Sequence, residues 1–266
     1  MVQSIDVFAA ADRYEFGMGA WSKVLAPLFI DFAGGIREAD KVLDVGCGTG
    51  ALTWTIAQTT QVASIVGIDP SNGFIEYART RQADPRVSFD VGDAQQLPYE
   101  NGTFDKCLAS LIMSFVPNAS QAAAEMRRVA KPGGVVATCY WDSQGGMELF
   151  ETFWSAAVAL DPKISEQSSR QRRYGTADSL ADLWRGAGLQ QVVTGGLAIP
   201  LHFKSFDAIW AYHTKAEGPS ANYTRSLPPD RQQILGERLR ENILGSRADG
   251  PITLQAKAWA VRGIVP

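Results

Sequence analysis

The chain has 266 residues, of which 45% are hydrophobic and 20% charged, with a net charge of -3 and a pI of about 5.5. The length suits one sizeable α/β domain or one domain with a cap, and the composition is that of an ordinary globular protein. The acidic balance argues against nucleic acid as a partner. The apolar runs are shorter than the roughly 18 residues that cross a bilayer, and residues 1–8 lack a signal-peptide pattern. Three widely spaced cysteines, Cys47, Cys107 and Cys139, predict reduced thiols in a cytoplasmic protein and no metal site.

The first 142 residues alternate short β-branched runs with helical patterns, which predicts βαβ units and a parallel sheet. Strands are expected at Lys41–Val45, Ser64–Ile68, Arg86–Val91, Thr103–Ala109 and Val135–Trp141, with helices at Ala51–Gln58 and Ser120–Ala130. The second helix should end at Lys131-Pro132-Gly133-Gly134, because proline cannot continue a helix and glycine supplies a turn.

The second half of the chain is less regular. A helix is expected at Met147–Leu160, a polar loop at Ser165–Arg173, a helix from an N-cap at Thr176 through Trp184, and strands at Gln191–Phe203 and Ile252–Val261. Residues 204–250 are aromatic at first and then form a charged helix around Asp230–Leu244. This insertion is too long for a plain loop, so we expect a helical cap over the site.

A glycine-rich turn follows the first predicted strand, where Gly46, Gly48 and Gly50 lead into a helix. Glycines let the backbone turn tightly and approach a ligand closely. The spacing Gly46-x-Gly48-x-x-Ala51 also satisfies the dinucleotide fingerprint. By itself the turn leaves nucleotide binding and a purely structural role open.

Aspartates close the first three predicted strands. Asp44 would repel the pyrophosphate of NAD but suits a ligand with an ammonium group, such as the methionine part of S-adenosylmethionine (SAM). Asp69 can accept from both hydroxyls of a ribose, and Asp93 from an adenine amino group, although either could instead cap the turn that follows it. Because open α/β sheets bind ligands at the carboxyl ends of their strands, the three aspartates indicate one crevice.

The ordered motifs of residues 41–141 resemble the class I SAM-dependent methyltransferases, and among them the ubiquinone and menaquinone biosynthesis group (methyltransferase type 11). They are Val42–Gly50, Val66–Asp69, Gly92–Ala94 with Leu97-Pro98, Phe104-Asp105 and Arg128–Gly134. The resemblance implies an α/β, Rossmann-like sheet of seven mostly parallel strands, with helices on both faces, an antiparallel last strand and a helical cap. It also implies one domain, residues 1–266: a cofactor-covering segment (1–40), a SAM-binding core (41–142) and substrate-cap insertions (143–175 and 204–250).

The resemblance also implies roles for the matching residues. Asp44 would contact the methionine part of SAM, Asp69 the ribose, and Asp93 with Ala94 the adenine. Leu111 would line the pocket. The complete expected cofactor set is Asp44, Gly46, Cys47, Gly48, Gly50, Asp69, Pro70, Ser71, Asp93, Ala94, Leu111, Tyr14 and Trp21.

The lead-in Arg13–Ser22 resembles a segment that folds over the cofactor in some members of the group. Tyr14 and Trp21 are therefore candidates to touch SAM or the substrate, the alternative being packing against the sheet. His213, among aromatic residues of the predicted cap, is a candidate base or positioning group, with Tyr14 as a second catalytic candidate. A partly exposed structural histidine is the alternative for His213.

The cap segments also carry aromatic side chains, which either line a substrate pocket or pack the cap on the sheet. They are Phe150, Trp154, Trp210, Tyr212 and Tyr223.

The expected function is methyl transfer from SAM to an O, N, C or S atom of a small, partly apolar or aromatic molecule, leaving S-adenosylhomocysteine (SAH). The cofactor carries the activated methyl group, so catalysis would rest mainly on proximity and in-line orientation. Ser110–Met113 stands where amine-methylating enzymes of this fold resemble one another in an Asn-Pro-Pro-Tyr-like motif, which argues against adenine or glutamine amines as acceptors. Two alternatives stay open: an NAD(P)-dependent oxidoreductase, and a SAM-binding protein without methyl transfer. We expect no integral membrane association, and the sequence leaves the oligomeric state open.

Overall fold

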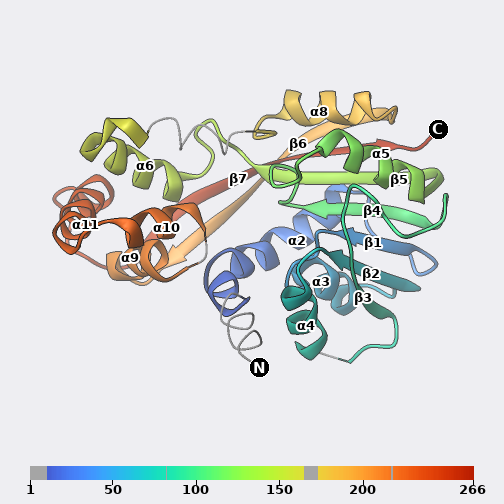
Figure 1. Cartoon of the computed structure of the whole chain (residues 1–266), viewed down its shortest axis with the longest axis horizontal. Coiled ribbons are helices and arrows are strands. Elements are labelled where there is room, and N and C mark those ends of the chain that lie inside the picture. The colour runs from blue at the N-terminus through green and yellow to red at the C-terminus, as the bar shows by residue number, and fades with distance from the viewer. Residues whose placement is uncertain (1–10, 82, 165–172, 217) are drawn as a thin grey trace.

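The computed structural model describes all residues except 1–10, 82, 165–172 and 217. Most of the predicted loop Ser165–Arg173 therefore lies outside the described residues. A seven-stranded sheet with the order β3-β2-β1-β4-β5-β7-β6 forms the centre of the molecule (Figure 1). Its strands are β1 (Lys41–Val45), β2 (Ser64–Asp69), β3 (Val87–Val91), β4 (Phe104–Ser110), β5 (Ala130–Trp141), β6 (Gln190–Phe203) and β7 (Ile252–Ile264).

The direction of the strands matches the predicted fold class. β1 pairs in parallel with β2 and β4, β2 with β3, and β4 with β5. β7, the last strand of the chain, runs antiparallel to both its neighbours, β5 and β6. The predicted Rossmann-like sheet of seven mostly parallel strands with an antiparallel last strand is therefore confirmed.

Side chains of β1 alternate between two buried layers, as the pleat of a strand requires. Val42 packs in the cluster formed with α2 (Ala20–Phe32) and α3 (Ala51–Thr59), and Asp44 bonds to α3 on the same face. Leu43 and Val45 pack on the opposite face, which α5 (Ala119–Val129) and α8 (Ala177–Gly186) cover. Helices on both faces account for the near-continuous apolar character of the strands.

Two further helical segments complete the core. α4 (Asn72–Arg81) packs beside α3 and β3 in a small cluster that contains Trp54, Ile75 and Phe89. A π-helical turn, η1 (Glu15–Gly19), precedes α2 without a break in helical backbone, since Tyr14 and Ala20 on either side both have right-handed helical angles. The N-terminal segment thus forms one continuous helix through η1 and α2.

The predicted cap consists of helices from two parts of the chain. They are α6 (Glu148–Leu160), the short η2 (Pro162–Ile164), α9 (Phe206–Lys215), α10 (Pro219–Ser226) and α11 (Pro229–Leu244). In Figure 1 these α-helices gather beyond one end of the long strands β6 and β7, with α2 between them and α3. The helical insertions are observed where the sequence predicts them, and their role over a substrate stays a prediction.

Strand β5 differs from the sequence prediction. It begins at Ala130, which pairs with Phe104, and not at Val135. The predicted turn at Lys131–Gly134 is an irregularity inside the strand, where the register shifts and Gly133 takes a φ of +76°. The prediction was wrong because the N–H of Gly133 bonds to Val265 at 2.9 Å, so pairing with the chain's last strand region keeps the segment in the sheet.

Candidate functional site

The glycine turn connects β1 to α3 and adopts a backbone that favours glycine at each of its three positions. Gly46, Gly48 and Gly50 have φ angles of +69°, +53° and +84°. A Cβ at Gly46 would lie 2.6 Å from Ile112, whereas one at Gly48 would have no atom of the described residues within 4 Å. The turn is therefore packed at its start and open at its middle, where a ligand can approach the backbone.

Asp44 is the second-last residue of β1, just before this turn, and is 1% exposed. Its Oδ2 accepts hydrogen bonds from the Thr53 N–H at 3.0 Å and the Thr53 hydroxyl at 2.6 Å. Its Oδ1 has no hydrogen-bond partner among the described residues. Burial raises the pKa of Asp44 to about 7. A buried carboxylate oxygen without a donor is costly, so this atom is a natural acceptor for a cationic group of a ligand.

Asp69 ends β2 and holds both sides of the crevice together. Its Oδ2 accepts from the N–H of Gly48, and its Oδ1 from the N–H of Ser71, each at 2.9 Å. Ser71 in turn accepts from the N–H of Phe74 at the start of α4. Asp69 therefore does cap the turn that follows it, which was the alternative to a ligand-binding role. Each oxygen keeps a further lone pair, so the carboxylate can also accept from ribose hydroxyls.

The remaining predicted cofactor residues differ in their surroundings. Asp93 is exposed and accepts from the N–H of Gln95 at 2.8 Å, in agreement with the capping alternative. Ala94 is buried beside it, and Pro70 is exposed at the rim. Cys47 points its sulfur at β2, because a Cβ on Gly67 would lie 2.9 Å from it. Burial raises the pKa of the Cys47 thiol well above its usual value, so the thiol stays protonated at neutral pH.

Leu111, just after β4, has a φ of +65° although it is not a glycine. Such a conformation is strained for a leucine and persists only where the surroundings enforce it. Its N–H donates to Cys139 at 2.9 Å, and its side chain is 6% exposed. Strained backbone of this kind concentrates at ligand sites, and this residue follows the strand next to β1.

Tyr14 lies against the crevice from the N-terminal side. Its ring is 5.5 Å from that of Phe74 on α4. Burial raises the pKa of Tyr14 to about 12, and the negative charges of Glu15, Asp69 and Asp44 act in the same direction. The hydroxyl therefore stays protonated at neutral pH and lies within electrostatic reach of both crevice aspartates.

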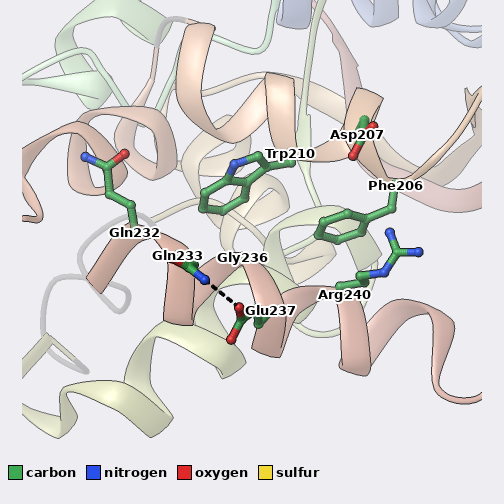
Figure 2. Close-up of a pocket in the computed structure, with 8 residues that line it drawn as sticks. All are labelled: Phe206, Asp207, Trp210, Gln232, Gln233, Gly236, Glu237 and Arg240. Atoms are coloured by element: carbon green, nitrogen blue, oxygen red, sulfur yellow. Dashed lines mark hydrogen bonds between the residues drawn. The ribbon is translucent and has the colours of Figure 1, made fainter. Parts of the chain in front are cut away.

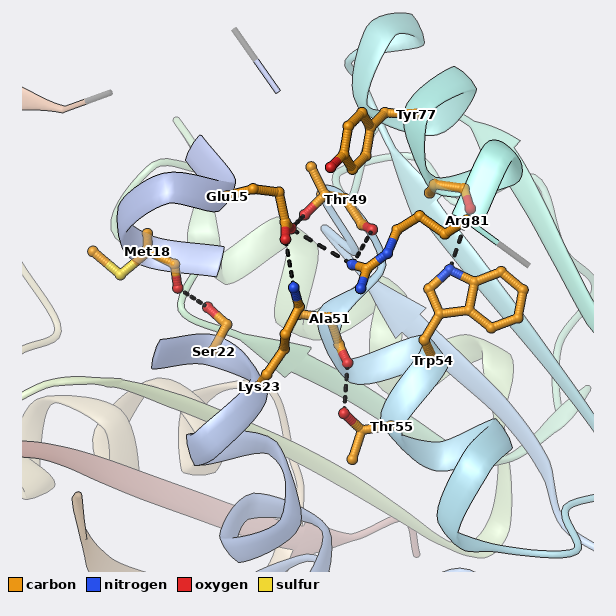
Figure 3. Close-up of polar contacts among 12 residues, drawn as sticks. Glu15, Met18, Ser22, Lys23, Thr49, Ala51, Trp54, Thr55, Tyr77 and Arg81 are labelled. Carbon is orange, nitrogen blue, oxygen red and sulfur yellow. Dashed lines mark hydrogen bonds and ion pairs between the residues drawn. The ribbon is translucent and has the colours of Figure 1, made fainter. Parts of the chain in front are cut away.

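Glu15 is a contact residue that the sequence did not reveal. Its Oε1 accepts from the Thr49 hydroxyl at 2.5 Å, which joins the N-terminal segment to the glycine turn (Figure 3). Its Oε2 lies 2.5 Å from Lys23 Nζ, and Arg81 Nη1 lies 3.6 Å from Oε1. No local pattern links two residues that are 34 positions apart. The only signal in the sequence is that Glu15 is an acidic residue next to the candidate Tyr14.

Trp21 belongs to the aromatic cluster of the cap. Its ring centroid is 4.8 Å from that of Tyr212 and 6.4 Å from those of Phe150 and Phe203. Its observed ring contacts are therefore with cap and β6 residues, and its contact with SAM or the substrate stays a prediction.

His213 is fully buried in the cap, which corrects the alternative of a partly exposed histidine. Its ring stacks on Phe153 at 4.3 Å, and its Nδ1 lies 3.0 Å from the Ser220 hydroxyl. Its Nε2 has no partner among the described residues. Burial lowers the pKa of His213 to about 3, so the ring is neutral at physiological pH and a weak base.

The cap aromatics pack chiefly on one another. The ring of Trp154 is 5.8 Å from that of Tyr223, and the Phe150 ring is 5.8 Å from that of Tyr212. Trp210 lines an open groove of about 380 Å³ between α9 and α11 (Figure 2). The groove residues are Phe206, Asp207, Trp210, Gln232, Gln233, Gly236, Glu237 and Arg240. None of the predicted cofactor residues lines this groove, so it is separate from the crevice of the glycine turn.

Neither a metal site nor a membrane-spanning helix is found among the described residues. No three His, Cys, Asp or Glu side chains there are placed to hold a metal ion. No helix in that part of the chain is long and apolar enough to span a bilayer.

Part of the chain is similar to proteins of known family. Residues 42–134 match a family described as a methyltransferase domain. Demethylmenaquinone methyltransferase of Staphylococcus aureus (strain MRSA252) is 38% identical over 125 residues, which cover 46% of this chain and 51% of that protein. The chain thus spans about half the length of the curated relative that it matches.

Solved structures share the fold across nearly the whole chain. YcgJ of Bacillus subtilis has a TM-score of 0.59 at 18% identity, covering 90% of this chain and 97% of that one. Phosphoethanolamine N-methyltransferase 2 of Haemonchus contortus, in complex with SAM, has a TM-score of 0.60 at 15% identity and covers 99% and 57%. At these identities the likeness extends to the fold alone.

Proposed function

We propose that this protein binds SAM and transfers its methyl group to a small acceptor, a proposal supported by the match of residues 42–134 to a family described as a methyltransferase domain. The observation that carries the proposal is the Oδ1 of Asp44, which has no hydrogen-bond partner among the described residues and lies beneath an open glycine turn. A buried carboxylate oxygen at that position suits the ammonium group of SAM. It would repel the pyrophosphate of NAD.

The crevice residues fit the rest of the cofactor as well. The free lone pairs of Asp69 can accept from the ribose hydroxyls, and the amides of the glycine turn lie beside them. Ala94 offers a buried apolar surface, and Asp93 an exposed carboxylate, at the end of the next strand. Bound SAM supplies a methyl group that its sulfonium centre already activates.

The chain's own contribution would be to bind, orient and exclude water. The cluster of Trp21, Tyr212 and Phe150 offers aromatic surface between the N-terminal segment and the cap, which supports a partly apolar or aromatic acceptor. Tyr14, protonated at neutral pH, can donate a hydrogen bond to the acceptor and would act by positioning. His213 is too weak a base at pH 7 to remove a proton readily.

We propose that the acceptor is a small molecule that receives the methyl group on an O, N, C or S atom. The described cysteines, Cys47, Cys107 and Cys139, are all buried free thiols. Free thiols are typical of a reducing compartment, which supports a cytoplasmic location.

The test is calorimetric titration of the full chain with SAH, SAM and NAD, repeated on Asp69→Ala. Micromolar binding of the first two ligands, no heat with NAD, and a loss of about tenfold or more in Asp69→Ala are expected. Asp182→Ala is the matched control, because Asp182 is an exposed acid on α8 that pairs with Arg185. Binding of NAD without SAH would overturn the proposal in favour of an oxidoreductase.

Turnover separates the proposal from a SAM-binding protein without transfer. Incubation with SAM and a panel of aromatic and apolar acceptors should release SAH, measured by mass spectrometry. If SAM binds tightly and no acceptor yields SAH, the transfer step of the proposal is contradicted.

A further inference from the structure

The carboxylate of Glu15 contacts three different elements of the fold. One oxygen accepts from the hydroxyl of Thr49 in the glycine turn, and the other pairs with Lys23 on α2. Arg81, at the end of α4, completes the group with Nη1 3.6 Å from Oε1. Figure 3 shows the carboxylate at the centre of these three side chains. A single residue of the N-terminal segment is thus joined to α2, to α4 and to the glycine turn.

Burial makes the contact between Glu15 and Thr49 stronger than an ordinary surface pair. The Glu15 side chain is 12% exposed, and Thr49 is 0% exposed. Lys23 and Arg81 reach in from positions with 40% and 27% exposed side chains. A hydrogen bond from a buried hydroxyl to a charged oxygen is worth more than one between neutral groups.

The backbone around Glu15 is shaped to allow the contact. The residue begins the π-helical turn η1, a rare geometry that occurs often at functional sites. A Cβ at Gly19 would lie 2.7 Å from Glu15 Oε1, so only a glycine there leaves the carboxylate in its place. A Cβ at Gly17 would lie 2.4 Å from the Tyr212 ring. The same turn therefore approaches the glycine turn on one side and the cap on the other.

We propose that Glu15 is a positioning residue for the glycine turn. By accepting a hydrogen bond from Thr49, it holds the N-terminal segment over the crevice and stabilises the turn conformation that binds the cofactor. The inference rests on the proposed function, because the turn matters only if it cradles the cofactor. Thr49 lies between Gly48 and Gly50, whose left-handed angles define the turn. A hydrogen bond to Thr49 therefore restrains the middle of the glycine turn.

Such a contact links cofactor binding to closure of the segment. If the bound cofactor stabilises the turn, it must stabilise the Glu15 contact by the same free energy, because linkage is reciprocal. Loss of the contact should therefore act mainly on cofactor release, since most changes within one binding site appear in the dissociation rate. A helix that merely packs on the sheet would show no such effect on the turn.

The first experiment measures amide hydrogen exchange of the ligand-free full chain by mass spectrometry. Glu15→Ala and Thr49→Val should each quicken exchange in both residues 11–19 and residues 46–50. Thr49→Ser keeps the hydroxyl and should behave like the unaltered protein. Lys23→Met removes an ion pair that does not touch the turn, so its effect should stay within the N-terminal segment. Faster exchange in Glu15→Ala that spares residues 46–50 would overturn the inference.

The second experiment measures SAH release from the same variants by stopped-flow displacement. Glu15→Ala and Thr49→Val should each release SAH about tenfold faster. The double variant should be no faster than either single one, because both remove the same contact. Additive effects, or unchanged release in either single variant, would contradict the proposal. If the unaltered protein binds no SAH, the proposed function fails, while the exchange experiment still decides the Glu15 contact.

Discussion

The N–H of Gly48 donates to Asp69 at 2.9 Å, so the carboxylate that ends β2 holds the middle of the turn that follows β1. Two adjacent parallel strands are thereby connected at their carboxyl ends through one side chain. The same carboxylate has free lone pairs for a ligand. Asp69 therefore both stabilises the conformation of the glycine turn and offers the polar group that would recognise the cofactor.

Gly48→Ala tests whether the open space at this turn belongs to the ligand. Its φ of +53° makes any Cβ strained, and the Cβ would point into space with no atom within 4 Å. We expect a loss of about 1 kcal/mol in stability and SAH affinity lower by at least tenfold. Gly35→Ala is the control, since Gly35 has a φ of +67° and equally open surroundings. Equal SAH affinity in both variants, by calorimetry, would place the ligand elsewhere.

Asp44 should make cofactor binding depend on pH. Its pKa of about 7 in the free protein means that the carboxyl is largely protonated below that pH, whereas an ammonium ligand favours the ionised form. SAH affinity should therefore rise as the pH increases from 6 to 8, with release of a proton to the buffer. Calorimetry in two buffers of different ionisation enthalpy measures that proton. Asp44→Asn should bind more weakly and with no proton release; an unchanged proton count would contradict the assignment.

His213 should affect stability and not the pH dependence of binding. Its pKa is lowered by burial to about 3 in the folded state, against about 6.5 when unfolded. Between these values the unfolded state binds the additional proton, so the free energy of unfolding falls as the pH drops below 6.5, by about 1.4 kcal/mol per pH unit. Urea denaturation of His213→Gln should lack this contribution. A slope equal to that of the unaltered protein would show that the ring is protonated when folded.

Asp44 contributes a slope of opposite sign over an overlapping range. Its raised pKa means that the folded state binds the additional proton between about pH 4 and pH 7, so this contribution to stability falls as the pH rises. The pH dependence of stability in His213→Gln is therefore compared with that of the unaltered protein, in which the contribution of Asp44 is the same.

Turnover of His213→Gln, once an acceptor is known, should match that of the unaltered protein. A large loss of turnover would restore the catalytic assignment of His213.

Thr176 offers a stability prediction that leaves the site untouched. Its hydroxyl accepts from the N–H of Ser179, and the Ser179 hydroxyl accepts from the N–H of Thr176, which forms a capping box at the start of α8. Thr176→Ala should lower the free energy of unfolding by about 1 kcal/mol, measured by urea denaturation, with unchanged SAH affinity. Weaker SAH binding in this variant would mean that α8 communicates with the crevice.

Much of this protein was determined by short stretches of its sequence. The strand at Lys41–Val45 and the helix that Thr176 caps were predicted to within a residue or two, because β-branched runs and capping act over a few neighbouring positions. The glycine turn and the aspartates after three strands were equally visible. In a parallel sheet, the end of a strand in the sequence is also the edge of the sheet in space.

Only the tertiary structure decided which distant segments meet. The Glu15–Thr49 contact, the stacking of Trp21 near Tyr212 and the complete burial of His213 all depend on how the N-terminal segment and the cap pack together. The start of β5 depended likewise on a bond to Val265 at the far end of the chain. Local propensity carries no information on such pairs, because their free energy comes from burial and charge contacts that exist only once the chain has folded.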